Sequence, residues 1–292
     1  MPELPEVEAL ARFLDFRTRD SDIARLELAS FSALKTVEPR LETLLGARAV
    51  AWRRRGKYLC LETDRVWLVI HLARGGWIRW YDQVPGAPAR PGRSPITLRL
   101  GFSAGEDGQA CPGLDLTEAG TAKRVSLWVV SDPEWIPGVA GLGIDPLDPA
   151  FDSQTLRRLL ASARGTVKSA LTTQSLIAGI GNAYSDEALH AARISPFRSA
   201  RSLPPAEVLT LHRALIDLFR AAVTARSDRG PADLKDDKRA AMRVHGRTGL
   251  PCPSCGDTIS EVAYGSRSLQ YCPTCQTNGR HHADRRLSRL MK

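Results

Sequence analysis

Residues 1–8 read Met1-Pro2-Glu3-Leu4-Pro5-Glu6-Val7-Glu8, and this stretch sets the start of the fold. Pro5 suits the first position of a helix, because its missing N–H would have no partner there. Glu6 and Glu8 are favourable near the positive end of a helix dipole. Apolar side chains then recur on one helical face, at Val7, Leu10, Ala11 and Leu14. The sequence therefore predicts an N-terminal helix that packs one face against a core.

The same stretch carries an unusual chemical group. If Met1 is removed, Pro2 becomes a secondary amine at the end of the chain, and an amine that condenses with an aldehyde forms a Schiff base. The adduct of a secondary amine is a permanent iminium cation, which labilises a neighbouring C–H bond. Glu3 places a carboxyl group beside it as a general acid or base. The alternative is that these residues only order the start of a helix.

The composition indicates a folded protein of two domains. A length of 292 residues favours two domains, and a hydrophobic content of 43% is enough for ordinary cores. No apolar run is long enough to cross a bilayer, and the charged N-terminus is unlike a signal peptide. We therefore expect a protein without a membrane partner that works in the cytoplasm.

Basic residues are concentrated in the second half of the chain. Residues 1–150 hold 19 Lys and Arg against 20 Asp and Glu, a net charge of −1, whereas residues 151–292 hold 22 against 12, a net charge of +10. A basic half is typical of a protein that binds a polyanion, and nucleic acid is the simplest candidate. The alternative is an alkaline protein whose arginines are only solvated.

Four of the six cysteines form two close pairs separated by sixteen residues: Cys252, Cys255, Cys272 and Cys275. Tetrahedral zinc needs four soft ligands, and two short knuckles deliver them at this spacing. The pattern predicts one structural Zn²⁺, with a pair of disulfides as the alternative. Cys60 and Cys111 are isolated and favour core or loop positions. His281 and His282 are not needed as ligands, so we expect them to be solvated.

The first half of the chain has the pattern of a β domain. Short segments with strand character recur along it, at residues 23–30, 47–63, 66–72, 78–81, 97–100 and 125–130. Such a series of short strands predicts a sandwich or a barrel. Residues 85–95 are rich in Pro and Gly and predict an exposed loop. Residues 132–149 have a similar composition and predict a linker.

From residue 152 the apolar period becomes helical. Asp152 or Ser153 is a suitable cap for a first helix, and further helices are predicted over residues 167–176 and 206–226. Residues 177–187 contain a Gly-Ile-Gly-Asn turn that leads directly into another helix. Backbone N–H groups at such a helix start can hold a phosphate, and simple helix packing is the alternative.

In combination, these features resemble the formamidopyrimidine-DNA glycosylase / endonuclease VIII family of base-excision repair enzymes. The resemblance rests on five stretches in the family order, at residues 2–8, 55–58, 71–72, 171–187 and 252–276. It implies an α+β protein with five successive parts: an N-terminal catalytic β-sandwich domain with an N-terminal helix (1–133), a linker (134–150), a helix-two-turns-helix domain (151–247), a four-cysteine zinc finger (248–278) and a basic tail (279–292).

The resemblance implies catalytic roles for four residues of this chain. Pro2 would attack C1′ of the damaged nucleotide and displace the base, while Glu3 would handle protons at the sugar. Lys57 would assist β-elimination; its alternative role is a charge that protects a strand edge from aggregation. Arg267 would hold a phosphate and assist the second, δ, elimination.

The same resemblance implies a set of DNA contacts. Lys57, His71, Asn182 and Arg267 would hold phosphates around the lesion, and Lys168 would contact backbone phosphate before the glycine turn. Contacts of this kind position a duplex without reading its sequence. For His71, the alternative is an ordinary histidine at a strand end.

Three positions depart from the family pattern. Arg74 stands where glycosylases that act on oxidised purines carry a wedge methionine, and it either stacks in the space of the extruded base or binds phosphate. Residues 115–121, expected as the loop that carries an Arg and a Phe, contain neither. Residues 226–240 are short for the aromatic loop that covers 8-oxoguanine. The departures concern void filling and the choice of damage.

We therefore expect a bifunctional DNA glycosylase and abasic-site lyase that acts as a monomer on damaged double-stranded DNA in the cytoplasm, at the nucleoid. Oxidised pyrimidines or ring-opened purines are expected as substrates ahead of 8-oxoguanine. The alternative from another class is a non-catalytic, zinc-dependent binder of damaged or structured DNA, although a binder has no need of a terminal secondary amine. A zinc-ribbon transcription factor would leave the β domain unexplained.

Overall fold

A computed structural model of the chain describes residues 1–92, 95–103, 111–226, 229–264 and 267–282. The chain divides into two compact units: Met1–Gly141 with Val223–Lys235, and Leu142–Ala222 with Asp236–Lys292. Residues 223–235 group with the first unit, although they fall within the helical domain expected at residues 151–247.

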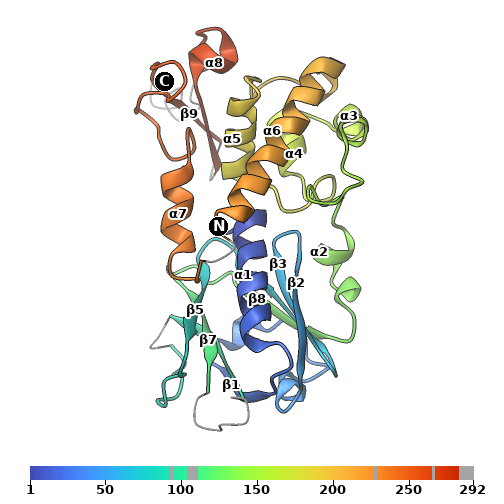
Figure 1. Cartoon of the computed structure of the whole chain (residues 1–292), viewed down its shortest axis with the longest axis vertical. Helices are drawn as coiled ribbons and strands as arrows, with labels where there is room; N and C mark the ends of the chain where they lie inside the picture. Colours follow the sequence, from blue (N-terminus) through green and yellow to red (C-terminus); the bar gives the residue numbers. More distant parts are fainter. Residues whose placement is uncertain (93–94, 104–110, 227–228, 265–266, 283–292) are drawn as a thin grey trace, which may run out of the picture. The chain divides into compact units, whose positions relative to one another are not determined.

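Two antiparallel four-stranded sheets build the first unit (Figure 1). In one sheet the strand order is β1 (Ile23–Leu28), β6 (Ile96–Phe102), β7 (Gly113–Glu118), β5 (Gly76–Tyr81). In the other sheet it is β2 (Ala49–Arg55), β3 (Tyr58–Thr63), β4 (Trp67–His71), β8 (Ser126–Val130). Alternate residues of both sheets enter one apolar core, as the period of a strand requires. The predicted β-sandwich is confirmed.

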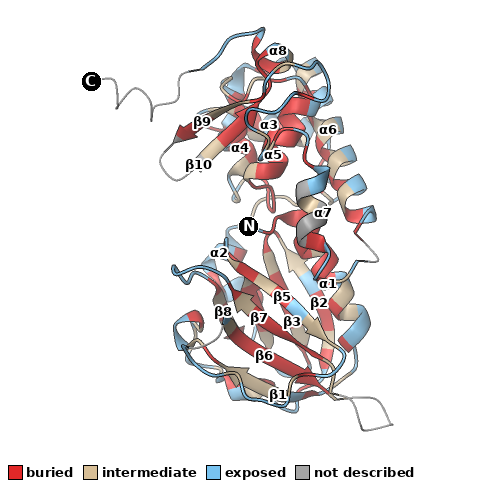
Figure 2. Ribbon diagram, turned by 90° about the vertical axis from the view of Figure 1, so that its left-hand side faces the viewer, coloured by how far each residue is buried: buried red, intermediate tan, exposed pale blue. Residues whose placement is uncertain are grey.

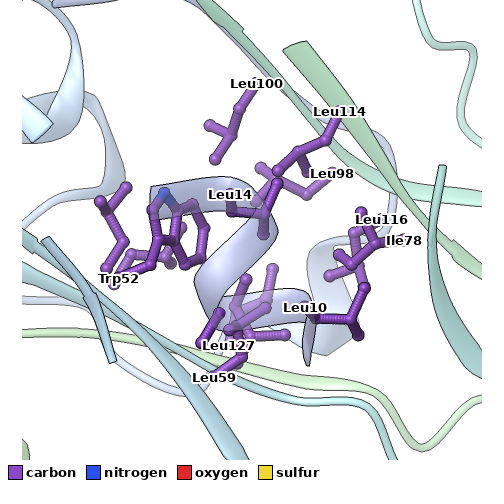
Figure 3. Close-up of a cluster of buried hydrophobic side chains, with 14 of the residues drawn as sticks. Leu10, Leu14, Trp52, Leu59, Ile78, Leu98, Leu100, Leu114, Leu116 and Leu127 are labelled. Atoms are coloured by element: carbon purple, nitrogen blue, oxygen red, sulfur yellow. The ribbon is translucent and has the colours of Figure 1, made fainter. Parts of the chain in front are cut away.

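Helix α1 (Leu4–Thr18) supplies the centre of this core. Figure 3 shows Leu10 and Leu14 of α1 among apolar side chains of both sheets, which include Trp52, Leu59, Leu98, Leu100, Leu114 and Leu127. The helix begins at Leu4 with Glu3 as its cap, so Pro5 occupies the second helical position rather than the expected first. The N-terminal helix is therefore part of the sandwich and is fixed by it.

The described part of the first unit also contains four short helices: η1 (Phe31–Ala33), η2 (Leu41–Leu44), η3 (Pro133–Trp135) and α2 (Pro137–Ala140). The last two lie at the start of the predicted linker at 134–150. Glu134 forms an ion pair with Arg55. Gly138 lies against Tyr58, because a Cβ atom there would come within 2.2 Å of the Tyr58 hydroxyl oxygen. The first part of the predicted linker is thus packed on the β2–β3 turn.

The predicted proline-rich loop at 85–95 is described as far as residue 92, and it is held by charged side chains. Arg25 and Arg99 donate to its backbone carbonyl groups at 2.7 and 2.6 Å, and Glu27 accepts one of its N–H groups at 2.7 Å. Arg99 is also paired with the buried Asp115 at 2.7 Å. The composition of this loop predicts that it is exposed, and these contacts hold its backbone in place.

The second unit is mostly helical and contains a two-stranded sheet before the last helix that the structure describes (Figure 2). Asp152 caps its first helix, with an oxygen 2.7 Å from the backbone N–H of Thr155, as the sequence predicts. No helix among the described residues has both the length and the apolar character that a membrane crossing needs. The elements are α3 (Ser153–Ser162), α4 (Val167–Thr172), α5 (Asn182–Ala191), η4 (Ala200–Ser202), α6 (Pro205–Thr224), α7 (Leu234–Ala241), β9 (Ser260–Tyr264), β10 (Arg267–Tyr271) and α8 (Pro273–Thr277). The last residues of α6 and the first residues of α7 fall within 223–235 and group with the first unit.

Truncation of a core leucine of α1 tests its central position. We expect Leu14→Ala to lower the free energy of unfolding by about 3 kcal/mol, because the side chain is fully buried and leaves a cavity. Phe16→Ala on the same helix is the control, since Phe16 is 86% exposed and its loss should change stability by less than about 0.5 kcal/mol. Urea unfolding measures both, and equal losses would show that α1 is not central to the core.

Candidate active site and zinc centre

The predicted catalytic lysine lies on the tight turn between β2 and β3. Arg55 pairs with Tyr58 across the turn, which leaves Gly56 and Lys57 as its two central residues. Gly56 has a φ of +56°, a left-handed conformation that favours glycine. The turn directs Lys57 into the protein, where only 7% of the residue is exposed.

One arginine fastens this turn to the start of α1. The Arg54 guanidinium donates to a carboxylate oxygen of Glu8 at 2.9 Å and to the backbone carbonyl oxygen of Gly56 at 3.3 Å. The Arg54 side chain is only 5% exposed, so water screens the ion pair little. Because Glu8 lies in the first turns of α1, the N-terminal residues and the Lys57 turn form one rigid piece. Neither Arg54 nor Glu8 could be recognised from the sequence as a contributor to the site, because their contact joins residues 46 positions apart.

Pro2 and Glu3 are buried at the beginning of α1. Glu3 forms a reciprocal capping box with Glu6, in which the Glu3 backbone N–H donates to a Glu6 carboxylate oxygen at 2.9 Å. Glu3 therefore has a structural role whether or not it also transfers protons. In the chain as written, Met1 acylates the nitrogen of Pro2, and the lone pair of this nitrogen is delocalised into the amide. The nitrogen becomes a nucleophilic amine only when Met1 is removed.

His71 ends β4 directly beside the Lys57 turn. It pairs with Tyr58 across the sheet, and the two ring centroids are 4.9 Å apart. Burial, and then the neighbouring Lys57 ammonium, lower the pKa of His71 below its usual value of 6.5. Two potential cations, Lys57 and His71, thus lie close together on one edge of the sandwich. An anionic group such as a phosphate would offset the repulsion between them.

Arg74 is presented by a very tight turn between β4 and β5. Ala73 has a φ of 51°. A Cβ atom at Gly75 would come within 2.5 Å of the Ala119 carbonyl oxygen, and one at Gly76 within 2.2 Å of the Leu72 carbonyl oxygen. The backbone of this turn is therefore fixed against its neighbours, and the Arg74 side chain at its tip is exposed.

The expectation of a loop at residues 115–121 is wrong for its first four residues. Residues 115–118 belong to β7, where Asp115 is buried against Arg99. The loop between β7 and β8 spans residues 119–125 and includes Lys123 and Arg124. A buried charge pair requires a partner from another strand, and a local sequence pattern does not reveal which residue that partner is.

The glycine turn of the second unit is joined to the zinc hairpin. Gly181 caps α5, and the side-chain amide of Asn182 donates to the backbone carbonyl oxygen of Ser268 in β10 at 2.6 Å. Arg267 precedes Ser268, and its backbone pairs with Tyr264 at the start of β10. The Arg267 side chain lies outside the part of the chain that the structure describes. Asn182 and the Arg267 strand are thus held side by side.

Lys168 is buried within the second unit rather than presented to solvent. Its ammonium group donates to three acceptors, at 3.1 Å to the Asn182 carbonyl oxygen, at 3.0 Å to the Ser185 hydroxyl and at 2.5 Å to the Asp186 carboxylate. Three N–H donors are thereby satisfied by three oxygen atoms. This geometry makes Lys168 a support for the turn at Asn182.

Two adjacent acids of α5 fix the segment that leads to the zinc finger. Asp186 accepts from His245 Nδ1 at 2.8 Å, in addition to its bond with Lys168. The buried Glu187 accepts three backbone N–H groups of residues 243–245, at 2.8 to 2.9 Å. A carboxylate that accepts several N–H bonds replaces the hydration it has lost. No sequence signal pointed to Asp186, Glu187 or His245 as a group, because their contacts join residues far apart in the chain.

The four predicted zinc ligands come together in the second unit. Their sulfur atoms all lie within 4.8 Å of one another, close to the separation of about 3.8 Å that tetrahedral bonds of about 2.3 Å produce. Backbone N–H groups of Ser254 and Cys275 approach the sulfur atoms of Cys252 and Cys272 at 3.4 Å, and such donors stabilise metal-bound thiolates. These residues fit one structural Zn²⁺.

Helix α5 also reaches the zinc centre. His190 Nε2 lies 3.3 Å from the sulfur of Cys252. An imidazole N–H at this distance is an outer-shell donor that orients a metal-bound thiolate. One helix therefore carries the glycine turn at its start and supports the zinc centre at its end.

Comparisons with known proteins agree with this architecture along the chain. The formamidopyrimidine-DNA glycosylase N-terminal domain matches residues 1–113, its H2TH domain matches 142–230, and the zinc finger found in FPG and IleRS matches 249–278. A formamidopyrimidine-DNA glycosylase of Symbiobacterium thermophilum is 36% identical over 94% of this chain and 89% of its own length. An uncharacterized formamidopyrimidine-DNA glycosylase-like protein of Mycobacterium tuberculosis is 52% identical over 53% of this chain and 98% of its own length.

Solved structures show the same similarity. The crystal structure of MutM (Fpg) from Thermus thermophilus has a TM-score of 0.77 and 31% identity, with coverage of 94% of this chain and 98% of that one. Lactococcus lactis Fpg in complex with DNA that contains N7-benzyl-Fapy-dG has a TM-score of 0.81 and 28% identity, with coverage of 94% and 100%. The chain belongs to the formamidopyrimidine-DNA glycosylase family, DNA-repair glycosylases with a zinc finger.

Replacement of Lys168 tests whether this side chain stabilises the turn at Asn182 or contacts a DNA phosphate. We expect Lys168→Met to lower the free energy of unfolding by about 3–5 kcal/mol, because it leaves the buried Asp186 carboxylate without its cation. Arg164→Met, at an exposed position nearby in the sequence, is the control and should be close to neutral. Thermal unfolding and duplex binding are measured on both variants. Unchanged stability with weaker duplex binding would instead assign Lys168 to DNA.

The lowered pKa of His71 gives a pH dependence with a definite sign. Because the folded state disfavours the protonated ring, stability is complete above the ordinary pKa of 6.5 and is lost as the pH falls through the lowered value. We expect the wild type to lose more stability than His71→Asn between pH 7.5 and 5.5. Urea unfolding at the two pH values measures the difference, and equal losses would contradict it.

Proposed function

We propose that this chain is a bifunctional DNA glycosylase and abasic-site lyase that removes oxidised bases from double-stranded DNA. The observation that carries the proposal is the single rigid piece formed by Pro2, Glu3 and the Lys57 turn, which Arg54 fastens together. A residue set that includes a potential secondary amine, a buried carboxyl group and a buried ammonium suits Schiff-base chemistry. A protein that only binds DNA would not need it.

The proposed reaction begins when Met1 has been removed. The Pro2 nitrogen bonds to C1′ of the damaged nucleotide as the bond from C1′ to the base breaks, and the base leaves with a proton. Glu3 donates and accepts protons at the sugar, where its burial beside Pro2 keeps it within reach. Opening of the sugar ring leaves an iminium cation between Pro2 and C1′.

Strand cleavage follows from the acidity that the iminium gives to the neighbouring C2′–H bond. Loss of that proton expels the 3′ phosphate by β-elimination, which Lys57 assists. Arg267 then assists expulsion of the 5′ phosphate by δ-elimination. Hydrolysis of the remaining adduct releases Pro2 for another turnover. No redox partner is needed, because the steps transfer protons, expel leaving groups and, in the final hydrolysis, consume one water molecule.

We assign the remaining polar residues to the DNA backbone. Lys57 and His71 on the first unit, and Asn182 and Arg267 on the second, would each contact a phosphate. Their number explains why affinity should depend on salt, since each neutralised phosphate releases counterions. Lys168 supports the turn at Asn182 in this proposal and does not touch DNA itself.

The favoured substrates are oxidised pyrimidines and ring-opened purines rather than 8-oxoguanine. The Lactococcus lactis relative has been crystallised with DNA that contains Fapy-dG, a ring-opened purine. This chain differs from the purine-specific pattern at Arg74, which lies exposed at the tip of its turn. A planar guanidinium can stack flat on an aromatic face such as a base. We infer that the protein acts as a monomer.

Trapping with sodium borohydride tests the reaction. The purified zinc-loaded protein, with loss of Met1 verified by mass spectrometry, is incubated with abasic duplex DNA and the reductant. We expect a covalent complex with the wild type and none with Pro2→Gly. Glu3→Gln should alter trapping without loss of folding, because glutamine can still accept the capping hydrogen bond.

Two lysine variants distinguish the step that forms the Schiff base from the elimination step. Lys57→Ala should still be trapped, while its rate of strand cleavage falls by at least about a hundredfold. Lys35→Ala, at an exposed position in the same unit, is the control and should keep both activities. A processed wild-type protein that binds the abasic duplex but is never trapped would identify the alternative, a non-catalytic binder.

A further inference from the structure

The second unit contains a cavity of about 600 Å³ that none of the proposed DNA contacts lines. It lies where α5 ends, α6 begins and α8 ends. Its polar lining includes Arg193, Ser195, Arg198, Asn278, Arg280 and His282. A volume of this size is typical of a site that holds a small ligand or a short peptide segment.

The charge of the walls points to an anionic ligand. Three guanidinium groups line the cavity, from Arg193, Arg198 and Arg280, against one carboxylate, Glu207. Glu207 is already paired with Arg198. Within the described residues, the guanidinium groups of Arg193 and Arg280 have no hydrogen-bonded or ionic partner. The cavity therefore offers two guanidinium groups that an incoming carboxylate can engage bidentately.

The backbone of Arg193 gives an independent reason to look for a ligand. Arg193 follows the C-cap of α5 with a φ of 55°, a left-handed conformation. Glycine is the usual residue there, and other residues cost roughly 1–2 kcal/mol. The fold would therefore be at least as stable with glycine at position 193. The local backbone therefore does not require an arginine at this position, and its side chain is available to a ligand.

The floor of the cavity is already satisfied. The amide of Gln276 donates to the Ile194 carbonyl oxygen at 3.0 Å and accepts from the Cys272 N–H at 2.9 Å. The Thr277 hydroxyl lies 2.6 Å from the Arg280 carbonyl oxygen. The ring of His282, which lines the cavity, stacks on Phe197 outside the lining with centroids 3.8 Å apart. Recognition would thus come from the guanidinium groups and an aromatic rim rather than from the floor.

The position of the cavity separates it from the DNA contacts proposed above. Asn182 begins α5 and Arg193 follows its end, so about 15 Å of helix lies between them. A recessed cavity also suits a flexible chain better than a duplex, because DNA is stiff over about 50 nm and cannot bend into a depression. Charge, recess and distance together favour a peptide over nucleic acid.

We propose that this cavity is a docking site for an acidic peptide segment of a partner protein. Two carboxylates of the segment engage Arg193 and Arg280, and an apolar side chain rests against the Phe197–His282 stack. The site is independent of the glycosylase reaction, so a bound segment leaves the chemistry at Pro2 unchanged.

Binding of a labelled hexaglutamate peptide to the full zinc-loaded chain tests this proposal by fluorescence anisotropy. We expect saturable binding that weakens with salt, and a loss of about tenfold or more in affinity for the double variant Arg193→Gly with Arg280→Ala. Arg157→Ala with Arg164→Ala removes the same charge from exposed positions of the same unit and should bind within about twofold of the wild type. The Arg193→Gly change should also leave thermal stability unchanged or raised.

Three results would overturn the proposal. Equal affinity of both double variants would show attraction to the overall positive charge only. Full competition between the peptide and an abasic duplex would place the cavity on the DNA surface. Displacement of the peptide by inorganic phosphate at equal concentration would show an unspecific anion site. Borohydride trapping of the cavity variant should equal that of the wild type, so a failure of the proposed glycosylase function remains distinguishable.

Discussion

The architecture of the first unit depends on the contact between Glu8, Arg54 and the Gly56 carbonyl oxygen. Its two hydrogen bonds, at 2.9 and 3.3 Å, join a helix to a β-turn in a nearly dry environment. The helix is fixed in turn by leucines that lie between both sheets. A chemical group at the end of a chain is normally mobile, and here the whole sandwich holds it at a constant distance from a lysine.

The second unit uses the same principle with a different helix. Helix α5 has an asparagine at one end that holds a hairpin strand, two acids in its middle that hold α4 and the segment before the zinc finger, and a histidine at its other end beside a zinc ligand. Loss of any one contact would shift the others, because they share one rigid rod. Metal binding, helix position and hairpin position are therefore coupled within the unit.

Features with local causes could be predicted from the sequence. The four cysteines, the Asp152 cap and the helix that starts near Pro5 all follow from spacings of a few residues, and the structure has each of them. Features with distant partners could not. Residues 115–118 were misplaced because Asp115 finds Arg99 across the sheet, and the burial of Lys168 depends on Asp186, eighteen residues later. Charged side chains look alike in a sequence whether they face water or one another.

The capping box at Glu3 has a practical consequence. Because Glu3 is the cap of a buried helix and the residue before it is itself buried, that residue has little freedom to rotate. An affinity tag or even a short cloning remnant at the amino terminus would therefore do more than mask one nitrogen. In the proposed reaction it would also obstruct the approach of the sugar to Pro2, so preparations meant for assay should carry their tags at the carboxyl terminus.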